Sequence, residues 1–177
     1  MRTPIISLVY FGMLAVLHGS CSEEMKAKES ATLYKDLQGQ EKAYRSYDSA
    51  LALFDVPFTE DYVETDYGSS HLLISGQDGR PPVFLLPGLF GDATMWYANM
   101  GALSGHYKVY APDMPNYGGK SVPSEKKIKA LEDYQRWLAQ LMEHYALDKV
   151  TLIGVSYSSW LATALSNTMP DQIVSLV

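Results

Sequence analysis

The stretch GVSYS, residues 154–158, holds a serine where a hydroxyl could act as a nucleophile. A short apolar run precedes it and a helical pattern follows it, so the segment joins a buried strand to a helix. In such a tight turn, small residues two positions before and after the serine let strand and helix approach closely. Gly154 and Ser158 meet that requirement. The spacing predicts covalent catalysis by Ser156, with the Tyr157 N–H directed at a developing oxyanion.

A second interpretation of the same stretch needs no chemistry. Serine is a favourable helix N-cap, because its hydroxyl can accept a hydrogen bond from a backbone N–H of the first helical turn. The segment SYSSW offers several serines that could do this. Taken by itself, the pentapeptide leaves both interpretations open.

Two other stretches have the composition of loops that would surround such a serine. FLLPGLFGDATMW, residues 84–96, is a buried strand followed by a glycine-rich turn and a helix. A turn of this kind supplies a second oxyanion donor, and the backbone N–H of Leu89 is the candidate. YAPDMPNYGGKS, residues 110–121, is a turn-rich loop after the next strand, in which we expect Asp113 to be a structural turn residue.

Taken in order, these three stretches resemble the α/β-hydrolase superfamily, in which HG turns, DxxGxGxS loops and GxSxG elbows follow one another. The similarity extends over residues 49–177 and is closest to carboxylesterase-like members. It implies an α/β-hydrolase fold, a mostly parallel sheet with flanking helices that is incomplete at the C-terminus. It also implies that Ser156 is the nucleophile and that the backbone N–H groups of Leu89 and Tyr157 form the oxyanion hole.

Some positions depart from the family pattern, and part of the catalytic machinery is missing. Pro87 stands where the family usually has His, and Ser158 where it usually has Gly. The superfamily order is Ser, then Asp or Glu, then His, but no His follows Ser156 and the only acid after it is Asp171. All four His residues precede the nucleophile, and we expect His71 to be a strand residue near the surface. We therefore expect an N-terminal portion of a hydrolase, which alone catalyses poorly.

The resemblance implies a serine hydrolase that acts on carboxylic esters or related acyl compounds through an acyl-enzyme on Ser156. It implies a small-molecule ester or acyl substrate and no metal or organic cofactor, and it leaves the oligomeric state open. The alternative is an inactive envelope lipoprotein that keeps the fold as a binding or interaction module. Pro87, Ser158 and the absent triad partners are the features that favour this alternative.

The elements that must position these residues are predicted from the periodicity of apolar side chains. Short apolar strands alternate with amphipathic helices, which favours an α/β fold with a largely parallel sheet. We expect strands at residues 62–65, 71–75, 83–86, 107–111, 150–153 and from 173, and helices at residues 94–103, 128–145 and 158–168. A further helix is expected between residues 33 and 54, where apolar side chains recur at helical spacing.

Composition excludes other classes of protein. The 177 residues are 47% hydrophobic and 19% charged, which suffices for a sizeable core in one domain. The net charge is -6, and no stripe of Lys and Arg is interleaved with aromatic residues. Nucleic acid is therefore not an expected partner.

The N-terminus has the layout of a signal peptide. Arg2 is followed by an apolar run over residues 5–17, which is shorter than the roughly 20 residues that a membrane-spanning helix needs. The segment VLHGSC resembles the lipobox of bacterial lipoproteins, although His18 stands where an aliphatic residue is usual. The resemblance implies cleavage after residue 20 and lipidation of Cys21, the single cysteine of the chain.

Three segments follow from these observations. We expect a signal peptide at residues 1–20, a tether and N-terminal helix at residues 21–54, and the N-terminal portion of the α/β-hydrolase domain at residues 55–177. The expected location is the bacterial cell envelope, with membrane contact through a lipid anchor at Cys21. An ordinary secreted protein and a retained hydrophobic N-terminus are the alternatives.

Overall fold

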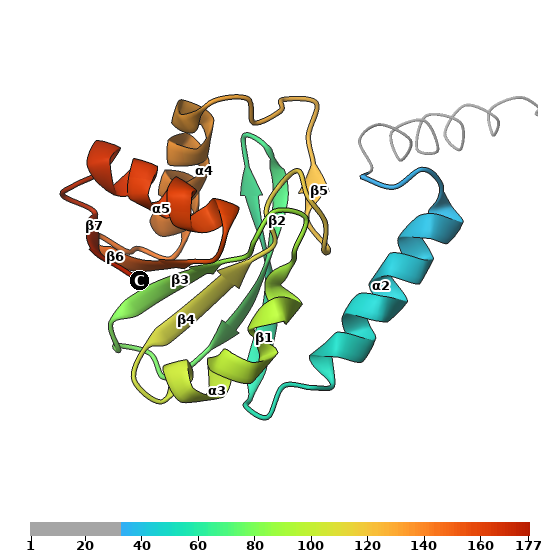
Figure 1. Cartoon of the computed structure of the whole chain (residues 1–177), viewed down its shortest axis with the longest axis horizontal. Coiled ribbons are helices and arrows are strands. Elements are labelled where there is room, and N and C mark those ends of the chain that lie inside the picture. The colour runs from blue at the N-terminus through green and yellow to red at the C-terminus, as the bar shows by residue number, and fades with distance from the viewer. Residues whose placement is uncertain (1–32) are drawn as a thin grey trace, which may run out of the picture. The chain divides into compact units, whose positions relative to one another are not determined.

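The computed structural model describes residues 33–177, which form one sheet with helices packed on both of its faces (Figure 1). The expected signal peptide and the expected lipidation site at Cys21 lie outside the described residues. Within the described range, no helix is long and apolar enough to cross a membrane.

The sheet is mixed and contains seven strands in the described part of the chain. Its order is β1-β2-β4-β3-β6-β7, with the short β5 paired to β2. The pairs that involve β2 are antiparallel, whereas β4, β3, β6 and β7 run parallel to one another. The strands are β1 (Phe58–Thr65), β2 (Gly68–Ser75), β3 (Pro82–Leu86), β4 (Lys108–Pro112), β5 (Val122–Pro123), β6 (Val150–Gly154) and β7 (Ile173–Leu176). The predicted fold class, a mostly parallel α/β sheet with flanking helices, is confirmed.

The helices lie close to the predicted positions. They are α2 (Leu37–Leu51), the 3₁₀ helix η1 (Ala93–Trp96), α3 (Tyr97–Ser104), α4 (Leu131–His144) and α5 (Tyr157–Thr168). The single helix expected at residues 94–103 is therefore divided into a 3₁₀ turn and an α-helix. The two-residue strand β5 was not predicted, because so short a segment has no periodicity of its own.

Strand β3 shows why the sheet is buried on both faces. Its side chains alternate, so Phe84 and Leu86 pack with Trp137 of α4 in one apolar cluster. Val83 and Leu85 point to the other face and join the cluster under η1 and α3. These four side chains are fully buried, which is typical of a strand in the parallel part of an α/β sheet.

The strand order sets the place of the candidate site. From β3 the chain passes to β4 on one side, and after α4 it returns to β6 on the other side of β3. Loops that leave two such neighbouring strands in opposite directions open a crevice at the carboxyl ends of the strands. The loop after β3 contains Leu89 and the turn after β6 contains Ser156, so both lie at this switch point (Figure 1).

Candidate active site

Ser156 occupies a strained turn between β6 and α5. Its backbone has φ 56° and ψ -120°, a conformation that L residues rarely adopt and that costs about 1–3 kcal/mol. Gly154 explains how the turn closes: a Cβ added there would lie 2.3 Å from the carbonyl oxygen of Ser158. The approach of strand and helix that the sequence pattern requires is thus present, and only glycine fits at position 154.

The N-cap interpretation accounts for less of this geometry. Ser156 does occupy the N-cap position of α5, but its side chain makes no capping hydrogen bond within the described residues. Its positive φ also differs from the extended backbone that capping residues usually have. The residue is exposed, so its hydroxyl is accessible to a substrate.

The turn after β3 lies directly against Ser156. A Cβ built on Gly88 would lie 3.7 Å from the Ser156 Cβ and 3.6 Å from the Val155 carbonyl oxygen. The turn is closed by the Gly91 N–H, which donates to the Gly88 carbonyl at 2.9 Å. Phe90, at the third position of this turn, has φ 62°, so the turn holds a second strained residue.

Two backbone N–H groups flank Ser156 in this arrangement. The Leu89 N–H belongs to the turn between Gly88 and Gly91. The Tyr157 N–H is the first of α5, where N–H groups have no intrahelical acceptor and the helix dipole is positive. Donors of this kind stabilise negative charge that develops on a carbonyl oxygen.

Asp113 organises the two loops at this end of the sheet. Its carboxylate is fully buried and accepts the N–H of Ala93, at the start of η1, and the N–H of Lys120, both at 2.7 Å. Gly119 has φ 73° and leaves room for the Asp113 carboxylate, which a Cβ at this position would approach to 2.2 Å. Asp113 is therefore a structural residue, but it holds the loop after β3 as well as its own.

His71 is the residue for which the prediction was wrong. It was expected near the surface, but it is fully buried in β2. Its Nδ1 lies 2.8 Å from Asp113 Oδ2, and its Nε2 lies 2.9 Å from Glu60 Oε2. No local pattern indicates this burial, because β1 and α2 cover His71 only in the folded chain, where Tyr62 and Tyr47 pack against its ring.

The same cluster attaches α2 to the site. The Tyr47 hydroxyl donates to Asp113 Oδ1 at 3.3 Å, and burial beside this carboxylate raises the pKa of Tyr47 far above its ordinary value. Lys120 Nζ lies 2.7 Å from carboxylate oxygens of both Asp48 and Glu60. The hydroxyl of Tyr34 donates to the Gly119 carbonyl at 2.7 Å. The segment before the sheet thus helps to support the loops of the candidate site.

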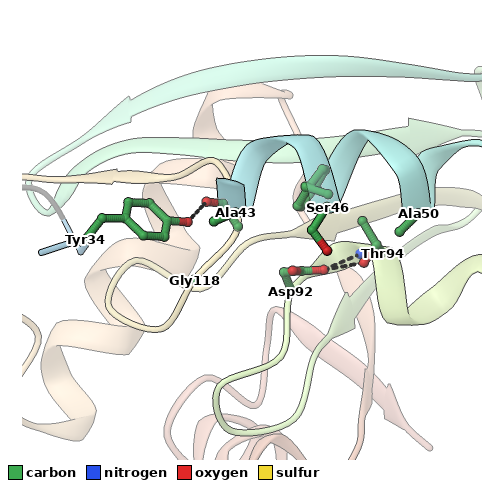
Figure 2. A pocket seen from close by; sticks show the side chains of 9 residues that line it. Tyr34, Ala43, Ser46, Ala50, Asp92, Thr94 and Gly118 are labelled. Atoms are coloured by element: carbon green, nitrogen blue, oxygen red, sulfur yellow. Dashed lines mark hydrogen bonds between the residues drawn. The ribbon is translucent and has the colours of Figure 1, made fainter. Parts of the chain in front are cut away.

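A cavity of about 280 Å³ lies between α2 and these loops (Figure 2). Its polar lining includes Ser46, Asp92 and Thr94, and the Asp92 carboxylate accepts the Thr94 N–H at 2.9 Å. Ser156 is not among the residues that line it. The cavity therefore adjoins the side of the loops that faces α2 and does not adjoin Ser156.

Aromatic side chains form a row beside Ser156. The ring of Tyr117 lies 5.9 Å from that of Phe90 and 6.1 Å from that of Tyr157, and the Tyr157 ring lies 5.5 Å from that of Trp160. A hydrogen bond of 2.8 Å between the hydroxyls of Tyr117 and Tyr134 holds the Tyr117 ring in this row. Phe90 is 78% exposed and Trp160 59% exposed, so this aromatic row offers apolar surface next to the site.

No metal centre is present in the part of the chain that the structure describes: no three His, Cys, Asp or Glu side chains are grouped to hold an ion. Ser156 and Tyr157, predicted from one segment of sequence, and Leu89, predicted from another, lie together at one end of the sheet. Two features of the site were missed. One is the cluster around His71 and Asp113, and the other is a contact between Ser158 and Pro87, in which the Ser158 hydroxyl donates to the Pro87 carbonyl.

Comparison with known proteins agrees with this fold. A family model described as alpha/beta hydrolase fold matches residues 81–177. Among curated proteins, the chain is 31% identical over 132 residues to the uncharacterized carboxylesterase nap of Bacillus subtilis, covering 75% of this chain. It is also 31% identical over 113 residues to the carboxylesterase YbfK of the same species, covering 64% of this chain.

A solved structure shares the fold. The naproxen esterase (carboxylesterase NP) of Bacillus subtilis superimposes with a TM-score of 0.75 at 29% identity, covering 80% of this chain and 49% of its own. The chain spans 44% of the length of nap and 38% of that of YbfK, so less than half of each relative is matched.

Proposed function

Because the chain belongs to the α/β-hydrolase fold family and is homologous to carboxylesterases, we propose that it is the nucleophile-bearing part of a serine hydrolase that cleaves carboxylic esters or related acyl compounds. The observation that carries the proposal is the backbone of Ser156. Strain is costly for a structural serine. Its strained backbone and its exposed side chain, which makes no capping hydrogen bond in the described chain, are two features without a structural role. They are what a serine nucleophile needs.

The proposed reaction begins with attack of Ser156 Oγ on the acyl carbon. The carbonyl oxygen becomes negative, and the N–H groups of Leu89 and Tyr157 stabilise it. Collapse of the tetrahedral intermediate releases the alcohol and leaves an acyl-enzyme on Ser156, which water hydrolyses. The general base is a His, oriented by an acid, and we propose that sequence outside the 177 residues supplies both.

The aromatic row supports a substrate with an apolar part. Its exposed rings flank the Leu89 turn and the start of α5, where an acyl or alcohol group would lie. Burial of such a group against these rings contributes about 25 cal/mol for each Å² removed from water. Short-chain aryl esters are therefore suitable first substrates.

The test is covalent labelling with a fluorophosphonate probe. The protein is expressed from its gene together with the coding sequence downstream of codon 177. We expect Ser156 to be labelled, and Ser156→Ala to abolish both labelling and turnover of an aryl ester. Ser166→Ala, in the same helix but bonded only to the Thr163 carbonyl at 2.9 Å, is the matched control and should retain both. Labelling that survives Ser156→Ala would remove Ser156 from the mechanism. Absence of labelling in the wild-type protein would favour the alternative, an inactive binding or interaction module.

We also propose that the protein is lipid-anchored in a bacterial envelope through Cys21. The apolar run over residues 5–17, the small residues before Cys21 and the polar segment after it support this location.

A further inference from the structure

The two departures from the family pattern are in direct contact with each other. Pro87 and Ser158 stand where the family usually has His and Gly, and the Ser158 hydroxyl donates a hydrogen bond to the Pro87 carbonyl. Ser158 is fully buried and Pro87 is buried as well. A glycine at position 158 would have no side-chain donor for this carbonyl, and a buried acceptor left without a partner destabilises the fold.

We infer that Ser158 is a positioning residue: its hydroxyl, acting through the Pro87 carbonyl, fixes the turn that carries the Leu89 N–H relative to Ser156. The inference rests on the proposed function, since it concerns the oxyanion hole of that reaction. Ser158 does not reach a substrate in this arrangement, because its hydroxyl is buried against the turn.

The geometry of the turn explains how one hydrogen bond can have this effect. Pro87 has a fixed φ, and the Ser158 bond sets the direction of its carbonyl. The next carbonyl, that of Gly88, accepts the Gly91 N–H at 2.9 Å. Since the peptide group is planar and trans, the direction of the Gly88 carbonyl also determines the direction of the Leu89 N–H.

The far end of the turn is anchored independently. Asp113 Oδ1 accepts the Ala93 N–H at 2.7 Å, four residues after Leu89. The near end, at Pro87, depends on Ser158 of α5, the helix that begins next to the nucleophile (Figure 1). Loss of the Ser158 hydroxyl should therefore release the side of the turn that faces Ser156 and leave the other side in place.

The first experiment uses the protein with its downstream sequence and needs no catalysis. Hydrogen exchange at the Gly91 N–H reports whether the turn is closed, because that N–H is bonded to Gly88. We expect exchange to be about tenfold faster in Ser158→Ala and Ser158→Gly, while amides in β4 keep their protection. Ser166→Ala is the control on the same helix and should change neither. Unchanged exchange at Gly91 in both Ser158 variants, or equal acceleration in β4, would overturn the inference.

The second experiment measures reaction in the protein with its downstream sequence. We expect Ser158→Ala to lower kcat about tenfold with KM unchanged, and to weaken binding of an arylboronic acid, which forms a tetrahedral adduct on the serine, by a similar factor. Removing an oxyanion donor outright costs about 10²–10³ in kcat, so a displaced donor costs less. Equal kcat in Ser158→Ala and wild type would overturn the positioning role. If the wild-type protein does not react, the proposed function fails. Hydrogen exchange at the Gly91 N–H then decides by itself whether Ser158 holds the turn.

Discussion

At the scale of single residues, strain is concentrated around the candidate nucleophile. Ser156 and Phe90 both have positive φ, and Gly88 of the Phe90 turn packs directly on Ser156. Such backbones persist only where the surrounding structure holds them, and they gather at functional sites. The buried carboxylate of Asp113 and the hydroxyl of Ser158 hold the two ends of this turn.

A charged cluster behind the site makes stability depend on pH. Burial raises the pKa of Glu60, but hydrogen bonds from Lys120 and His71 outweigh that effect and hold the pKa below its ordinary value of 4.5. A carboxylate whose pKa is lowered by folding stabilises the folded state above its unfolded pKa. That contribution is lost as the pH falls through the lower, folded pKa.

We therefore expect Glu60→Gln to lower the urea midpoint at pH 7, and the difference from wild type to shrink as the pH falls below about 4.5. Urea unfolding curves at pH 7, 5, 4 and 3 measure this. Glu64→Gln, an exposed glutamate of the same strand, is the control and should leave the midpoint nearly unchanged. A difference between Glu60→Gln and wild type that is constant over this pH range would show that the ion pairs contribute nothing.

At the scale of elements, α4 is followed by a residue whose backbone is strained. The Leu147 N–H donates to the Met142 carbonyl at 2.9 Å, and the Ala146 N–H donates to the Glu143 carbonyl at 3.1 Å. This is the Schellman pattern, in which the residue after the C-cap has a left-handed backbone and is usually glycine. Here it is Ala146, with φ 52°.

Ala146→Gly should accordingly stabilise the protein by about 0.5–1 kcal/mol, since glycine adopts a positive φ without the Cβ clash. Part of the gain is offset by the greater freedom of glycine in the unfolded chain. Ala139→Gly, within the same helix, is the matched control and should destabilise by about 1 kcal/mol. Urea denaturation compares the two, and a lower midpoint for Ala146→Gly would contradict the prediction.

At the scale of the whole molecule, the proposed anchor determines where the chemistry takes place. Cys21 is the single cysteine, and a polar segment separates it from the described fold. One acyl chain binds a membrane only marginally, whereas the several chains of a bacterial lipoprotein anchor it stably. An active site held close to a membrane would meet apolar esters at raised local concentration.

Cys21→Ser should block incorporation of labelled palmitate and signal-peptide removal at that site. Metabolic labelling and membrane fractionation measure both effects, and Ser22→Ala, at the neighbouring position, should behave as wild type. If Cys21→Ser still acquires palmitate and stays with the membranes, the lipoprotein interpretation is wrong and a retained hydrophobic N-terminus is the better one.

Local sequence patterns suffice to predict the elements and the tight turn at Ser156. Strands and helices follow from the spacing of apolar side chains, and the small residue at Gly154 is required by contacts within one turn. The order of the glycine-rich turn, the following loop and the serine turn also predicts that Leu89, Tyr157 and Ser156 form one candidate site.

The distant residues that support that site are brought to it by the folding of the chain. Burial of His71 depends on β1 and α2, the reach of Asp113 to Ala93 depends on β3 lying beside β4, and the contact of Ser158 with Pro87 depends on β6 lying beside β3. Each is a hydrogen bond between segments far apart in the chain. Periodicity describes which face of an element is apolar, but strand order sets which loops meet, and therefore no local pattern could have revealed these contacts.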